Sequence, residues 1–244
     1  MIGRDLVKNL ATRSQTSELN VVREYCQHLF LSYFYRQKGS EKVLFKGGTA
    51  LKIIYGSPRF SEDLDFSGFN VSIPLIEELA EKALLEIERE GIGVEILESK
   101  ETSGGYLSII APGFLDYKVR IQLEISLRKE SAVEGIVVLI ASDLLPPYTL
   151  LQLPEDLLVA EKVEALFRRR KPRDFFDLYF VLRSRLTIPE DYRKAHQLKD
   201  RILELLESEK IDFRGELKLF LPRSHQAILK NFATSLGNEI ERYL

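Results

Sequence analysis

The sequence predicts an α/β (α+β) protein in two parts, with a mixed-sheet core over residues 1–150 and an all-helical domain over residues 151–244. Short apolar runs with strand-like alternation occur only in the first part. Apolar residues recur at helical spacing throughout the second part. Hydrophobic residues make up 45% of the 244 residues, which is enough for a sizeable core.

The first part begins with a helix followed by a strand–helix–strand unit. Residues 17–34 place apolar side chains at helical spacing. The run KVLFKGG predicts a short buried strand that ends in a turn, and TALKIIYG predicts a short helix. We expect Thr49 to be the N-cap of that helix and Gly56 to stop it. The run SEDLDFSG predicts the next strand.

A second helix and further strands complete the first part. Pro74 opens a predicted helix that runs to about Glu90 and is ended by Gly91. Residues 103–105, Ser-Gly-Gly, predict a hairpin loop between the first two of the strands that follow. These strands are VEILES, YLSIIA, KVRIQLEISL and GIVVLIAS.

Helices follow the prolines Pro146 and Pro147, which lie near the joint between the two parts. The predicted helices are PEDLLVAEKVEALFRRR, RDFFDLYFVLRSR, YRKAHQLKDRILELLES and a last helix from about Ser224.

Composition excludes several functional classes. A formal net charge of −2 provides no global field for nucleic acid, so a polyanion site must be a local patch. The single cysteine, Cys26, excludes an internal disulfide framework and a multi-cysteine zinc site. Its three histidines lie far from any motif, which argues against a histidine base. Without a signal peptide or a membrane-length apolar run, we expect a cytoplasmic protein with no membrane partner.

Three carboxylates form the sharpest chemical signal. Asp63 and Asp65 alternate with apolar Leu64 and Phe66, so a strand would present both acids on one face. Glu124 has the same apolar–acid–apolar surroundings and would complete a cluster if its strand were a neighbour. Carboxylate oxygens suit Mg²⁺ or Mn²⁺ with substrate phosphates as further ligands. A solvated edge strand or a turn with side-chain hydrogen bonds remains the alternative.

Glycines and cations supply candidate phosphate sites. Gly47 and Gly48 let the backbone approach a ligand at a predicted helix start, although such pairs often merely turn the chain. Lys162 lies on the first helix of the second part. The end of that helix carries a patch that could hold triphosphate or an RNA backbone, or that simply complements the helix dipole. Its members are Arg168, Arg169, Arg170, Lys171 and Arg173.

Together these motifs resemble the AbiEii/AbiGii family of nucleotidyltransferase toxins, within the DNA polymerase β-like superfamily. The resemblance spans roughly Phe45 to Leu182. The first motif comprises Gly47, Gly48, Thr49, Ala50, Leu51, Tyr55, Gly56, Arg59, Ser61, Asp63 and Asp65. The second comprises Glu161, Lys162, Ala165, Leu166, Arg173, Asp174, Asp177 and Leu178. Glu124 matches the third carboxylate of the superfamily more loosely.

The resemblance implies a nucleotidyltransferase core whose active-site cleft the helical domain completes. It implies transfer of a nucleoside monophosphate from an NTP with release of pyrophosphate, and a cognate antitoxin as partner. Some family members modify the 3′ acceptor end of tRNA, so we expect tRNA or another RNA as acceptor.

By residue, the resemblance implies that Asp63 and Asp65 hold the metal, with Glu124 as the third acid. Gly47, Gly48 and Ser61 would contact the triphosphate. Phosphate charge would be bound by Lys162 and neutralised by Arg59, and Asp174 would be an essential acid.

Other interpretations of the sequence stay open. The acceptor could be a protein hydroxyl, or the chain could be a nucleotide-binding regulator without catalysis, although binding alone would tolerate the loss of one acid. A metal-dependent nuclease would leave the glycine pair without a function, and Ser126 stands where many nucleases place a lysine. An interaction domain would leave Lys162 unexplained.

Overall fold

The computed structural model describes residues 1–129, 133–208 and 211–244. The chain divides into two compact units. The first unit contains Met1–Gly56 and Phe60–Leu153, and the second contains Ser57–Arg59 and Pro154–Leu244.

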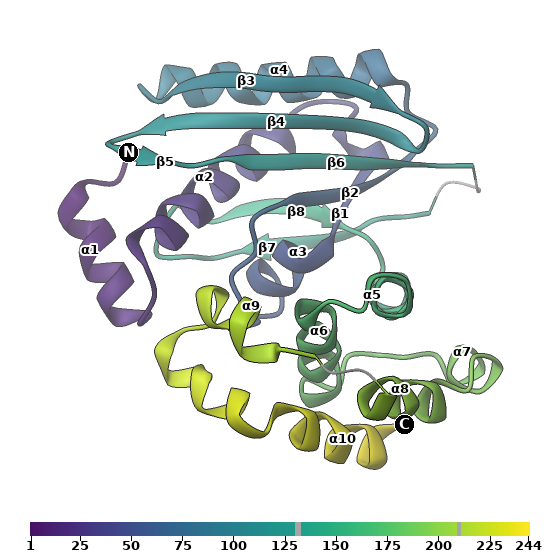
Figure 1. The fold of residues 1–244 in the computed structure, drawn as a ribbon. Coiled ribbons are helices and arrows are strands. Elements are labelled where there is room, and N and C mark those ends of the chain that lie inside the picture. The colour runs from purple at the N-terminus through teal and green to yellow at the C-terminus, as the bar shows by residue number, and fades with distance from the viewer. Residues whose placement is uncertain (130–132, 209–210) are drawn as a thin grey trace. The chain divides into compact units, whose positions relative to one another are not determined.

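The first unit is built on a mixed eight-stranded sheet with the order β3-β4-β6-β2-β1-β8-β7 and with β5 paired to β4 (Figure 1). Strand β2 runs antiparallel to β1 and parallel to β6, so it lies between them. The strands are β1 (Val43–Lys46), β2 (Leu64–Phe69), β3 (Gly93–Thr102), β4 (Gly105–Phe114), β5 (Tyr117–Lys118), β6 (Ile121–Arg128), β7 (Ile136–Ile140) and β8 (Tyr148–Gln152).

Long helices and aromatic side chains form the core on one face of this sheet. The Phe66 ring on β2 contacts Phe34 of α2 at 5.6 Å and Phe45 of β1 at 5.5 Å between centroids. Ser17 caps α2 by accepting a hydrogen bond from the Asn20 amide at 3.2 Å. The helices of the unit are α1 (Arg4–Arg13), α2 (Glu18–Phe34), α3 (Gly47–Ile53) and α4 (Ile73–Arg89), with a 3₁₀ turn η1 at Ser40–Lys42.

The second unit is helical apart from its short Ser57–Arg59 segment. Its core is a cluster of aromatic and leucine side chains in which Phe176 of α6 stacks on Phe232 of α10 at 5.8 Å. The elements are α5 (Glu155–Arg169), α6 (Pro172–Arg183), α7 (Glu190–Ala195), α8 (Leu198–Ser208), α9 (Phe213–Phe220), a 3₁₀ helix η2 (Arg223–Asn231) and α10 (Phe232–Tyr243).

The structure confirms the predicted α/β fold class, and several local details differ. Helix α3 begins at Gly47 with Lys46 as its N-cap, so the prediction of Thr49 as the cap is wrong. The Thr49 hydroxyl instead donates to the Asp63 carbonyl. The segment YRKAHQLKDRILELLES forms two helices, α7 and α8, because Gln197 adopts a left-handed φ of 47° between them. Helices α1 and α9 and strand β8 have no counterpart in the sequence predictions.

Within residues 1–129, 133–208 and 211–244, no helix is long and apolar enough to cross a membrane.

Candidate active site

A row of residues crosses four strands on one face of the sheet, opposite the aromatic core. Lys46 on β1 stands across from Asp65 on β2. Asp65 stands beside Glu124 on β6, and Glu124 faces Leu107 on β4. Residues paired across a ladder share a face, so the Asp65 and Glu124 carboxyl groups project on the same side of the sheet. The strand carrying Glu124 is therefore the direct neighbour that a carboxylate cluster required.

Gly47 makes room for the Asp65 carboxylate. A Cβ added to Gly47 would lie 2.0 Å from Asp65 Oδ2, and the glycine has a φ of +86°. Both the space and the backbone conformation therefore require glycine at this position. Gly47 is consequently part of the acid site as well as the first residue of α3.

The chemistry of these donors fits a hard divalent cation. Asp63 is half-buried and lies directly before β2, while Glu124 is exposed. In the described part of the chain, no group of three or more His, Cys, Asp or Glu side chains is placed so that it could hold a metal ion. Mg²⁺ is commonly bound through one or two carboxylates, with waters and substrate phosphates as its other ligands, so Asp65 and Glu124 in adjacent register are a suitable pair.

The loop before Asp63 is held by helix α2. Gln27 Nε2 donates to the carbonyl of Ser61 at 3.1 Å and to that of Glu62 at 3.0 Å. Ser61, a predicted triphosphate contact, is therefore fixed through its backbone while its side chain is half-buried. Gln27 was not identified from the sequence, because a glutamine within an apolar helical pattern gives no functional signal.

Lys46 is a second residue that sequence reasoning missed. Its side chain is 8% exposed and lies opposite Asp65. Opposite charges that face each other across an antiparallel pair attract, so Lys46 supplies a counter-charge beside the acid site. The available signal was a charged residue ending the apolar run VLFK, directly before Gly47.

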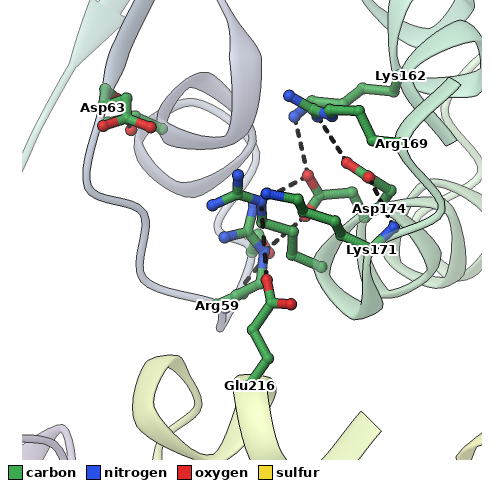
Figure 2. A network of polar contacts seen from close by, with 11 residues as sticks. Arg59, Asp63, Lys162, Arg169, Lys171, Asp174 and Glu216 are labelled. Atoms are coloured by element: carbon green, nitrogen blue, oxygen red, sulfur yellow. Dashed lines mark hydrogen bonds and ion pairs between the residues drawn. The ribbon is translucent and has the colours of Figure 1, made fainter. Parts of the chain in front are cut away.

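In the second unit, the Asp177 carboxylate holds the two cations that the sequence assigns to phosphate. These cations, Arg59 and Lys162, are labelled in Figure 2. Arg59 Nε and Nη2 donate to its two oxygens at 2.7 and 2.9 Å. Lys162 Nζ donates to Asp177 Oδ2 at 2.8 Å. Burial by itself would raise the pKa of Asp177, but the charges of Arg59 and Lys162 outweigh it and lower the pKa to about 2. Asp177 is therefore ionised at neutral pH and fixes both cations.

The contacts of Asp174 stabilise the N-terminus of helix α6. Its Oδ1 accepts a hydrogen bond from Arg169 Nη2 at 2.6 Å, and its Oδ2 accepts one from the Lys171 backbone amide at 3.2 Å. With 2% exposure, the residue closes a capping box at the beginning of α6. Its assignment as an essential acid stays a prediction.

The basic patch lies at the corner between α5 and α6. Arg168, Arg170 and Lys171 are exposed, and Arg170 caps α5 with a left-handed φ of 54°. Arg169 pairs with Asp174, and Arg173 Nε lies 3.7 Å from a Glu216 oxygen. Some of the patch is therefore engaged within the unit, and the rest faces solvent.

Comparison with known proteins identifies the family. The family model described as "Nucleotidyl transferase AbiEii toxin, Type IV TA system" matches residues 29–239. The chain belongs to the AbiEii family. The AbiEii match contains every predicted site residue, and it begins within α2. No curated protein matches the chain.

Solved structures support the AbiEii fold. The structure of JHP933 from Helicobacter pylori is 21% identical, with a TM-score of 0.58 and coverage of 93% of each chain. A structure named "putative nucleotidyltransferase from H. pylori" is 22% identical, with a TM-score of 0.59 and coverage of 93% of this chain and 95% of that chain. At these identities the likeness establishes the fold.

Replacing Asp177 by asparagine should destabilise the protein by about 3–5 kcal/mol, because two buried cations would lose their counter-charge. Urea unfolding followed by circular dichroism measures the change. The matched control is Asp191→Asn, which alters an exposed acid in the first turn of α7. Equal unfolding midpoints for the two variants would contradict the assigned importance of the Asp177 network.

The lowered pKa of Asp177 makes the stability of the protein depend on pH in the acid range. Its pKa is lowered on folding from 3.8 to about 2, so its stabilising contribution is complete above about pH 4. The contribution is lost as the pH falls through about 2. The difference in unfolding free energy between wild type and Asp177→Asn, measured in urea at a series of pH values, should be constant near neutrality and shrink over that range. A difference that grows on acidification would refute this pKa shift.

Replacing Gly47 by alanine should displace the Asp65 carboxylate and impair any activity that uses it. Gly56→Ala is the matched control, because Gly56 also has a positive φ, +75°, but no atom lies within 4 Å of its added Cβ. Both variants should lose roughly 1–2 kcal/mol from backbone strain. Only Gly47→Ala should lose nucleotidyl transfer at a temperature where both are folded. Equal activity in the two variants would show that the Asp65 position is not critical.

Proposed function

We propose that this AbiEii protein is a metal-dependent enzyme that transfers a nucleoside monophosphate from an NTP to an acceptor, releasing pyrophosphate. The observation that carries the proposal is the register of β2 and β6, which sets Asp65 beside Glu124 while Gly47 leaves space for the Asp65 carboxylate. Paired oxygen donors on rigid strands next to a glycine-lined backbone suit phosphoryl chemistry.

Asp65 and Glu124 would hold Mg²⁺ or Mn²⁺ as a pair of carboxylates in adjacent register. When bound, such an ion neutralises charge on phosphate oxygens and helps to activate the attacking oxygen. Lys46 lies opposite Asp65 and balances part of the negative charge of the acids. The exposed position of Glu124 leaves its oxygens accessible to a ligand, and Gly47 and Gly48 allow the triphosphate to approach the backbone closely.

Lys162 and Arg59 are proposed to bind phosphate oxygens of a substrate at the second unit. Their contacts with Asp177 support this assignment, because a cation held at a fixed position loses little side-chain entropy when it binds a ligand. Asp174 would then act by fixing the start of α6 through Arg169 and the Lys171 amide, which makes it a positioning residue.

The 3′ end of tRNA is the proposed acceptor, and the exposed members of the patch from Arg168 to Arg173 are proposed to contact its backbone. As a member of a type IV toxin–antitoxin family, the chain is proposed to act as the toxin of such a system, in the cytoplasm, opposed by a cognate antitoxin. A protein hydroxyl as acceptor is the second candidate, because the acid site itself does not select between hydroxyl groups.

Asp65→Asn and Glu124→Gln should each reduce transfer of radiolabelled nucleotide to unfractionated tRNA by at least about a hundredfold, because each removes a negative charge needed to hold the cation. Glu95→Gln, an exposed acid on β3, is the matched control and should keep wild-type activity. EDTA should stop the wild-type reaction, and added Mg²⁺ should restore it.

Each of the four NTPs is tested in turn with tRNA and with total protein as acceptors. Label in protein would favour the second candidate, and RNA shortened without NTP would indicate a nuclease. NTP binding without pyrophosphate release would indicate a catalytically silent regulator.

For the toxin role, expression of wild type should slow growth, and expression of Asp65→Asn at the same level should not.

A further inference from the structure

A hollow of about 390 Å³ lies in the first unit where strands β2 and β6 begin, and Asp63 forms part of its wall. The hollow therefore adjoins the acid site. Its lining residues come from α2, the segment before β2, strands β4, β5 and β6, and the link between β5 and β6. They are Arg23, Glu62, Asp63, Ile109, Lys118, Arg120 and Gln122.

Positively charged side chains outnumber carboxylates in this hollow, also after its internal ion pair is subtracted. Glu62 is engaged by Arg23 Nη2 at 2.9 Å. Lys118 and Arg120 are exposed, and neither forms an ion pair with any residue that the structure describes. Asp63 also lines the hollow, so after the Arg23–Glu62 pair Lys118 and Arg120 leave a net charge of one positive unit. This surplus favours an anionic group beside a predicted metal ligand.

Arg23 is held in place at the wall of the hollow. The residue is 9% exposed, and Nη1 contacts Asn20 Oδ1 at 3.4 Å. Its Nε is buried without a hydrogen-bond partner among the described residues. Its contacts with Glu62 and Asn20 fix the guanidinium at this position. Arg23 precedes the residues matched by the AbiEii model, so the family match does not assign it a function.

The hollow and the glycine pair lie on opposite sides of β2. Gly47 follows β1, which borders β2 on one side. Arg120 and Gln122 belong to the β6 side, and Ile109 lies on β4 beyond it. In-line displacement requires the attacking and leaving oxygens to lie on opposite sides of the α-phosphorus. With the pyrophosphate on the glycine side, the attacking hydroxyl approaches from the side of the hollow.

We propose that this hollow binds a backbone phosphate of an RNA acceptor and so directs its terminal hydroxyl toward the acid site. The inference rests on the proposed function. In the transfer step, the hydroxyl oxygen forms a bond to the α-phosphorus as the bond to pyrophosphate breaks, and the hydroxyl proton passes to solvent. In an RNA, a phosphodiester lies close to the terminal hydroxyl that attacks. This phosphodiester would contact Arg23, Lys118 and Arg120 in the hollow.

The test is the double variant Lys118→Gln/Arg120→Gln against Lys38→Gln/Lys42→Gln. The control removes the same charge from exposed lysines outside the hollow. The hollow variant should raise KM for unfractionated tRNA about tenfold, with kcat at saturating tRNA and NTP affinity in Mg²⁺ close to wild type. Binding of a fluorescently labelled single-stranded RNA without NTP should weaken similarly. The slope of log affinity against log salt should become shallower by about 0.7 for each phosphate that the variant no longer neutralises.

The binding measurement separates failure of this inference from failure of the proposed function. If wild type transfers nucleotide to RNA and both double variants behave alike, the acceptor hollow is refuted while the transferase stands. If wild type transfers nothing to any acceptor but the hollow variant alone loses RNA affinity, the RNA phosphate site stands and the transferase proposal fails. Transfer to protein with unchanged kinetics in the hollow variant would overturn the RNA acceptor site.

Discussion

The position of β2 between β1 and β6 is the constraint on which the candidate site depends. Because β2 pairs with both neighbours, one residue on it, Asp65, meets Lys46 on one side and Glu124 on the other. A shift of β2 by one residue would turn Asp65 into the aromatic core and Phe66 out of it. The contacts of Phe66 with Phe34 and Phe45 therefore fix the register that also orients the acids. The register of β2 therefore determines both the packing of the aromatic core on one face and the position of the acids on the other.

A different device holds the cations of the second unit. Asp177 is fully ionised at neutral pH although it is buried, because Arg59 and Lys162 both donate to it. Such an arrangement is weak support for stability in itself, since burying three charged groups has a large desolvation cost. It does fix the positions of two long side chains that would otherwise sample many rotamers. This property suits a site that must present positive charge to a ligand without reorganising.

The candidate acids were visible in the sequence because their signals are local, and their role in a site stays a prediction. Asp63, Asp65 and Glu124 each follow from apolar–acid alternation, and the glycine pair is visible by itself. What could not be predicted was the pairing of strands. Lys46 gains importance only when β1 is known to lie beside β2, and the hollow needs Arg23 and Arg120, which are distant in sequence. Thr49 was misassigned because its hydroxyl bonds the Asp63 carbonyl across a strand connection, not its own helix.

The proposed acceptor, the end of an RNA, is compatible with the charge of the chain. A chain with a net charge of −2 has no global field that attracts nucleic acid, so RNA must be bound by local groups of cations. A local hollow that contains Lys118 and Arg120 can contact only a small number of phosphates. Selection of the acceptor would then depend on fitting a free hydroxyl beside Glu124 while a nearby phosphate occupies the hollow. A chain terminus meets both conditions, whereas the interior of a paired RNA strand does not offer a free 3′ hydroxyl.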